Sequence, residues 1–178
     1  MKRLYYLAPS LNSVDKISKD LHEKGVTDWR FHIVSKDEAG LYSHHLHSAS
    51  AIQRTDLIRY VERGVIVGGL LGLCFTIPLA YLEEFTLNAW LAVSFFCLLF
   101  GAWTGGIGGI TQENYKIRRF HDEIEKGFYL IMVDVRKEDE ALIQRIMEVW
   151  HPEASLQGHS SNHINPFASS DSAGVVVR

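Results

Sequence analysis

The sequence predicts an α+β protein whose two halves are separated by a pair of membrane-spanning helices. Three observations carry this prediction. Charge is segregated along the chain, because the stretch from Gly64 to Ile110 holds only Glu83 and Glu84 as charged residues. Each polar flank has the pattern strand, helix, strand. Both apolar runs between the flanks are long enough to cross a hydrocarbon core.

The first half, residues 1–54, begins with the aromatic and apolar strand "RLYYLAP". A helix follows over 10–25, with Ser10 or Ser13 as its N-cap and Gly25 at its C-terminus. Its inward residues have helical spacing: Leu11, Val14, Ile17 and Leu21. A second strand in "DWRFHIVSKD" alternates apolar with polar side chains. Its apolar residues are Trp29, Phe31 and Ile33.

Residues 55–126 contain two connector helices and two apolar runs, at 64–82 and 87–110. The first run would extend roughly 28 Å as a helix. Neither run has the polar face that a helix of a soluble core shows. Because the intervening loop "EEFT" is short, the two spans must form an antiparallel hairpin. The connector helices, one capped by Thr55, are expected to continue directly from the spans.

Basic residues flank both apolar runs and are absent from the loop between them. The positive-inside rule places such residues on the cytoplasmic side of a membrane. We therefore expect a two-span membrane protein with both termini in the cytoplasm. The same side chains are candidates for contact with anionic lipid headgroups. They are Arg54, Arg59, Arg63, Lys116, Arg118 and Arg119.

Glycines recur every four residues along both apolar runs. Small residues at this spacing allow two helix backbones to approach closely in lipid, as in a glycine zipper. Facing residues of a hairpin have position numbers with a constant sum, and the two sets of glycines can be paired with a sum of 173. The pairs are Gly64 with Gly109, Gly68 with Gly105, and Gly72 with Gly101. We expect them to close the hairpin, and the same face could also receive another subunit.

The stretch "FGAWTGGIGGI" at 100–110 raises phosphate binding as an alternative. A dinucleotide fingerprint requires a strand before its glycines and a helix after them, and a P-loop requires Lys followed by Ser or Thr. Neither context is present. No nucleophile–base pair emerges either, so we expect a non-enzymatic protein without a cofactor. The formal charge of −3 gives no reason to expect a nucleic-acid partner.

The second half, residues 127–158, repeats the pattern of the first. It has an apolar strand "FYLIMVDV", a helix with Leu142, Ile146 and Val149 facing inward, and a short strand in "EASLQG". Two β-α-β halves form the split-βαβ, ferredoxin-like pattern, with the membrane hairpin inserted between the second and third strands. Residues 159–178 are expected to form a disordered tail.

The stretches "APSLNSVDKISKDLHEKGV", "FHIVSKDEAGL", "TDLIRYVERGVIVGGLLGL", "FHDEIEKGFYLIMVDV" and "HPEASLQG" lie within residues 4–158. Their layout resembles an uncharacterised family of bacterial two-span membrane proteins, a domain of unknown function. The resemblance implies a cytoplasmic ferredoxin-like domain and a membrane location. It implies no specific activity, although some such proteins are linked to stress responses.

The loop "SHHLHS" carries His44, His45 and His47. Three converging imidazoles can bind Zn, Ni or Cu, and the carboxylates of Asp37 and Glu38 are close in sequence. The same histidines could instead form a solvated loop or sense pH.

Together these patterns predict a non-enzymatic membrane protein whose cytoplasmic module acts in regulation, sensing or assembly. Its expected partners are the lipid bilayer and either further copies of itself or another membrane protein. The alternative is an accessory role in transport or metal homeostasis through the histidine loop.

Overall fold

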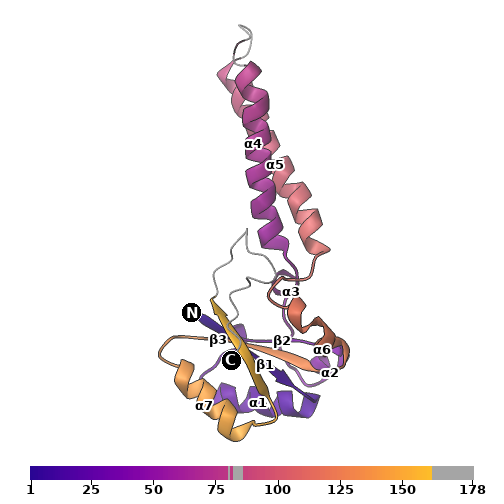
Figure 1. Ribbon diagram of the computed structural model, residues 1–178, viewed down its shortest axis with the longest axis vertical. Coiled ribbons are helices and arrows are strands. Elements are labelled where there is room, and N and C mark those ends of the chain that lie inside the picture. The colour runs from indigo at the N-terminus through magenta and orange to yellow at the C-terminus, as the bar shows by residue number, and fades with distance from the viewer. Residues whose placement is uncertain (80, 82–85, 162–178) are drawn as a thin grey trace. The chain divides into compact units, whose positions relative to one another are not determined.

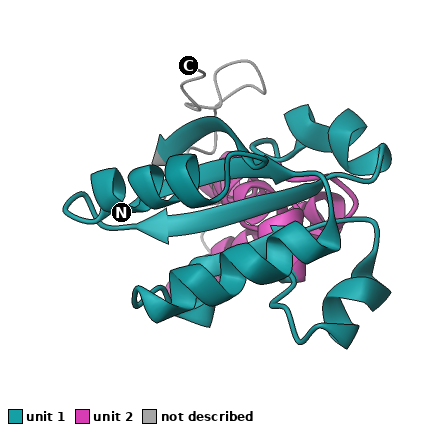
Figure 2. Cartoon of the chain, turned by 90° about the horizontal axis from the view of Figure 1, so that it is seen from below, with its two compact units in different colours: residues 1–50, 115–163, 169–178 teal, residues 51–114, 164–168 magenta. Residues whose placement is uncertain are grey.

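The computed structural model describes residues 1–79, 81 and 86–161 of the chain. Two compact units result (Figure 2). The described part of unit 1 comprises residues 1–50 and 115–161, and that of unit 2 comprises residues 51–114 without its masked loop positions. The loop residues Glu83 and Glu84, and the tail from 162 onwards, lie outside the described residues.

Unit 1 is built on a four-stranded antiparallel sheet with the order β2-β3-β1-β4. β1 (Lys2–Ala8) and β3 (Tyr129–Val135) lie at the centre and pair over their whole length. β2 (Phe31–Val34) and β4 (Ser155–Ser161) form the edges. The last strand is therefore longer than expected, and residues 159–161 belong to the sheet instead of the tail.

Helices α1 (Leu11–Glu23) and α7 (Glu140–Trp150) lie on one face of this sheet (Figure 1). The hydroxyl of Ser10 accepts a bond from the Ser13 N–H at 3.3 Å and so caps α1, as expected. Gly25 follows α1 with a φ of 86°, which favours glycine. The buried core between helices and sheet includes Leu4, Tyr6, Val14, Ile17, Leu21, Ile131, Val133, Ile143, Ile146 and Met147.

The inward face of α7 differs from the expected one. Ile143, Ile146 and Met147 are buried, whereas Leu142 and Val149 are 54% and 66% exposed. Both stripes have helical spacing and share Ile146, so periodicity does not distinguish them. The connection from β3 sets the rotation of α7, and that rotation cannot be read from the spacing of apolar residues.

The second face of the sheet is covered by η2 (Arg118–Phe120) and α6 (His121–Glu125), both within unit 1. Ile117, Phe120 and Ile124 join the sheet residues of this face in a second core cluster. The rings of Tyr5 and Phe120 stack with centroids 5.7 Å apart. Because both faces are covered, β1 and β3 are apolar almost without alternation.

Between β2 and unit 2 the chain forms short helices. Trp29 lies in η1 (Asp28–Arg30), not in the strand, and is 83% exposed. α2 (Glu38–Ser43) follows β2, and α3 (Ala51–Arg54) opens unit 2. Residues 47–49 bond along the outer edge of β2, because the Ala49 N–H donates to the Ile33 carbonyl at 2.8 Å.

Unit 2 contains α4 (Leu57–Leu79) and α5 (Leu87–Ile110). Both helices are long and apolar enough to cross a membrane. α5 has the expected bounds, and the Thr86 hydroxyl caps it by accepting from the Ala89 N–H at 3.3 Å. α4 begins seven residues before the expected span, at Leu57, and Pro78 lies in its last turn.

Candidate functional site

The packing of α4 against α5 in unit 2 depends on glycine. A Cβ atom on Gly64 would overlap the carbonyl oxygen of Gly101, and one on Gly68 would overlap that of Cys97. A Cβ on Gly105 would likewise overlap the carbonyl oxygen of Tyr60. The two backbones are therefore in direct contact, which requires glycine at these positions.

The pairing of the glycines is displaced by one helical turn from the expected one. A Cβ on Gly64 would lie 3.1 Å from the Cα of Gly105, and one on Gly68 would lie 3.1 Å from the Cα of Gly101. Position numbers of these pairs sum to 169 instead of 173. The helix ends set this register. Half of a sum is the position at the centre of the turn, and a sum of 173 would place that centre between Thr86 and Leu87, where α5 already begins.

The outer glycines face residues other than glycine on the opposite side of the hairpin. A Cβ on Gly72 would lie 3.3 Å from the Cβ of Cys97. One on Gly109 would lie 2.8 Å from both the Cα of Leu57 and the Cβ of Tyr60. The glycine-lined contact therefore extends along most of both helices, with its closest approach in the middle.

An apolar groove runs along one side of this contact. Its floor includes Gly64, Gly68, Gly101 and Cys97, and its volume is about 340 Å³. Its walls are formed by Val67, Leu71, Phe75, Phe96, Phe100 and Thr104. The Thr104 hydroxyl donates to the Phe100 carbonyl of its own helix at 2.9 Å and therefore offers no free donor to the groove. The groove suits apolar side chains or acyl chains.

A short antiparallel pairing closes the base of the hairpin, at residues 54–56 and 112–114, which we call the neck. An isolated β-bridge joins the two segments, and the Asn114 N–H donates to the Arg54 carbonyl at 2.7 Å. The connectors were expected to continue the spans as helices. This prediction is confirmed for the first connector, because α4 continues without a break from Leu57 into the apolar run. It is wrong for the second, because α5 ends at Ile110 and the chain passes through the neck before η2 and α6.

Arg59 and Asp56 form a buried ion pair beside the neck. Arg59 Nη1 lies 3.4 Å from Asp56 Oδ2, and each side chain is 8% exposed. Arg59 was expected among the residues that contact lipid headgroups. Its guanidinium is instead held next to a carboxylate inside the protein.

The other basic residues differ in exposure. Arg118 and Arg119 are exposed, whereas Arg54, Arg63 and Lys116 are half-buried. Burial is the largest cause that lowers the pKa of the Lys116 ammonium. Of the six basic residues predicted to contact headgroups, the two arginines of η2 are therefore the most exposed.

The structure does not assemble the expected metal site. His44, His45 and His47 are all exposed at the end of α2. Among the described residues, no three His, Cys, Asp or Glu side chains lie close enough to hold one metal ion. The nearby carboxylate of Asp37 caps α2 instead, accepting from the Gly40 N–H at 2.9 Å.

A row of polar side chains crosses the second face of the sheet in unit 1. Arg3 donates to both carboxylate oxygens of Asp134, at 2.8 and 2.7 Å. His32 Nε2 lies 4.0 Å from the same carboxylate, and the hydroxyls of Tyr5 and Ser160 are 2.9 Å apart. Arg3 and Asp134 are each a charged residue in a mostly apolar strand, and they lie opposite each other where β1 pairs with β3. This pair of charges is the signal in the sequence that could have indicated the polar row.

Burial lowers the pKa of the His32 imidazole, and the nearby charge of Arg3 lowers it further. The carboxylate of Asp134 opposes this shift, and the ring of His47, with its centroid 6.1 Å away, reinforces it. Together these effects favour the neutral form of His32 over the protonated form within the polar row.

Comparison of the chain with protein-family models, curated proteins and solved structures found no significant match.

The glycine contact predicts different effects for two neighbouring substitutions. Gly68→Ala should lower the free energy of unfolding of the hairpin by about 1–3 kcal/mol, because the new methyl group overlaps backbone. Gly69→Ala is the control, since its Cβ would meet only the flexible end of Leu98, at 3.3 Å. It should be neutral or stabilising by up to about 1 kcal/mol. Unfolding in mild detergent, followed by circular dichroism, measures both. Equal losses would contradict the contact.

Acidification should destabilise unit 1 through His32. The pKa of His32 is below its ordinary value of 6.5 in the folded protein, so below this pH the folded state binds fewer protons than the unfolded chain. Stability should therefore fall as the pH is lowered through 6.5. Urea unfolding of the full chain between about pH 7.5 and 5.5 measures the slope. His32→Gln should have a shallower slope, and an unchanged slope would contradict this role.

Proposed function

We propose that α4 and α5 cross a lipid bilayer as a hairpin. With 23 residues, α4 is about 34 Å long, close to the thickness of a hydrocarbon core. The apolar side chains on the outside of the hairpin support this proposal, since Leu70, Phe75 and Phe95 are 59%, 61% and 62% exposed. In water such a surface would be costly, whereas lipid solvates it.

The orientation we propose places unit 1 and both termini in the cytoplasm of a bacterium, with the protein in its inner membrane. Arg118 and Arg119 follow α5 within ten residues and are exposed, which supports a cytoplasmic base of the hairpin. Anionic headgroups are the lipid partners that these two guanidinium groups fit.

For unit 1 we propose a ferredoxin-like domain split by the hairpin. The strand order β2-β3-β1-β4, with α1 and α7 as the two crossover helices, supports this assignment. In the chain, the hairpin lies between β2 and β3. By analogy with other domains of this fold, and with the uncharacterised family that the sequence resembles, its role is regulation, sensing or assembly without catalysis.

We propose further that the protein self-associates in the membrane, and the groove beside the glycine contact is the observation that carries this. The groove provides a glycine floor, and the adjacent ridge of α5 provides aromatic side chains. Phe96 stacks on Phe100 at 5.9 Å, and both are more than half exposed. The groove and the protruding aromatic rings lie on one surface. A symmetric contact between two copies requires this, because the rings of each copy can then enter the groove of the other.

Filling the groove should abolish self-association. Val67 lines the groove and Leu99 does not, although both are 54% exposed. Val67→Trp should leave only monomer in native mass spectrometry from mild detergent, while Leu99→Trp should retain the multimer of the wild type. The bulky side chain occupies the space that the partner requires. A monomeric wild type, or a Val67→Trp variant that still associates, would contradict the proposal.

A further inference from the structure

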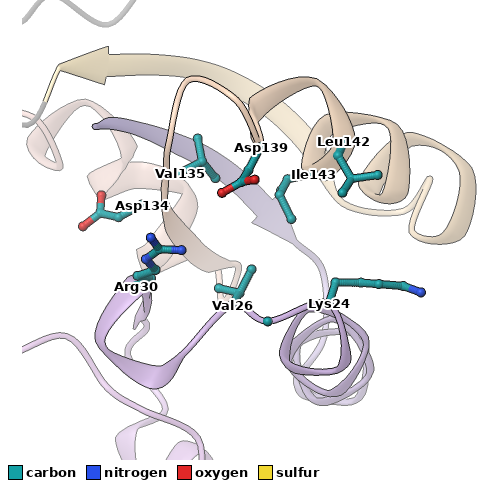
Figure 3. A pocket seen from close by; sticks show the side chains of 9 residues that line it. Lys24, Val26, Arg30, Asp134, Val135, Asp139, Leu142 and Ile143 are labelled. Atoms are coloured by element: carbon teal, nitrogen blue, oxygen red, sulfur yellow. The ribbon is translucent and has the colours of Figure 1, made fainter.

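A second site lies in unit 1, far along the chain from the glycine contact. A hollow of about 60 Å³ opens where the turn after α1 meets the connection from β3 to α7 (Figure 3). Its apolar floor includes Val26, Val135 and Ile143. Arg30 and Asp139 lie on its rim, on different segments of the chain.

Two other charged residues of this hollow are already engaged. Both carboxylate oxygens of Asp134 accept bonds from Arg3, and Figure 3 shows this carboxylate pointing away from the hollow. The ammonium of Lys24 lies over the ring of Trp150, 5.2 Å from its centroid. Only the stem of Lys24 therefore lines the hollow, and the charged groups of both residues are directed elsewhere.

Arg30 and Asp139 are different, because within the described residues neither side chain has a hydrogen bond or an ion pair. Figure 3 shows the guanidinium and the carboxylate directed toward the same space from opposite sides. They do not pair with each other, since no contact within 4.0 Å joins them. Both residues are half-buried, so their side chains are partly enclosed by the protein.

The carboxylate of Asp139 does not make the capping hydrogen bond that an aspartate before a helix normally makes. It precedes α7 and would be expected to accept from an N–H of the first turn. Its backbone is instead in the right-handed helical region, with φ −88° and ψ −11°, and its side chain makes no such bond. The carboxylate is therefore available to the hollow.

We propose that this hollow binds a small zwitterion with the backbone chemistry of a free α-amino acid. The ligand carboxylate would accept two bonds from the guanidinium fork of Arg30, and its ammonium would donate to the carboxylate of Asp139. The hollow has room for roughly four or five water-sized groups, which matches the heavy atoms of glycine. A ligand side chain would extend over the apolar floor.

The arrangement of charge favours a zwitterion over simple ions. An anion bound to Arg30 would be repelled by the carboxylate of Asp139. A cation bound to Asp139 would likewise be repelled by the guanidinium of Arg30. A zwitterion pairs both groups at once and leaves the net charge of the site unchanged. The site lies wholly in unit 1, so its occupancy does not depend on membrane insertion or self-association.

The test uses the full chain in detergent micelles, with glycine as the probe and amide NMR resonances as the readout. Glycine should cause saturable shifts at Gly25, Val26 and Val135, whereas acetate and methylammonium at the same concentration should not. Arg30→Gln and Asp139→Asn should each weaken glycine binding at least about tenfold, the usual effect of losing a charged hydrogen bond. Arg145→Gln and Asp122→Asn, at exposed sites of unit 1, are the matched controls.

Three outcomes would overturn the proposal. Equal shifts with acetate alone would indicate a simple anion site, and absence of saturable shifts would indicate no site. The third outcome concerns a direct ion pair between Arg30 and Asp139. If each single variant and the double variant lowered the melting temperature by the same amount, the two side chains would be paired with each other in solution.

Discussion

Glycine removes the side chains that would hold α4 and α5 apart, so that Gly64 and Gly68 lie against the backbone of the opposite helix. In the bilayer that we propose for the hairpin, its packing depends on this contact, because apolar side chains alone give no preference for helix over lipid. The same contact creates the groove, since a floor without side chains leaves space between the walls. Two threonine hydroxyls bond within their own helix, Thr76 to the Gly72 carbonyl at 2.7 Å and Thr104 to the Phe100 carbonyl at 2.9 Å. Shape, not polar bonding, therefore determines how the helices fit.

The order of strands in the sheet also constrains the two ends of the hairpin. β3 lies between β2 and β1, so the chain must leave after β2 and return to fill a central position in the sheet. A return of this kind requires the two ends of the hairpin to be close together. The neck meets that requirement through main-chain bonds, and the ion pair of Arg59 with Asp56 neutralises two charges beside it. Residues 117–124 then cover the second sheet face, so both faces of β1 and β3 are buried.

Much of this organisation can be predicted from the sequence, because charge segregation and apolar length are properties of single segments. They locate α5 at 87–110 and the apolar strand β3. Three features depend instead on how segments fit together: the glycine register, the rotation of α7 and the neck. Each is set by main-chain geometry, which the pattern of residue types within one segment does not determine. Periodicity does not distinguish Leu142 from Ile143 as the inward residue. The pairing of Arg3 with Asp134 required the strand register, and the hollow near Arg30 required the path of two loops.

Membrane insertion of the hairpin is the central claim, and labelling with a membrane-impermeant maleimide tests it most directly. Single cysteines would be introduced as Leu87→Cys, at the start of α5, and Trp29→Cys, in unit 1. Both residues are more than 70% exposed, and the native Cys74 and Cys97 would be replaced in the background. In intact spheroplasts the account predicts labelling of the Leu87→Cys variant alone, with Trp29→Cys labelled only after permeabilisation. Labelling of both variants from the same side would contradict it.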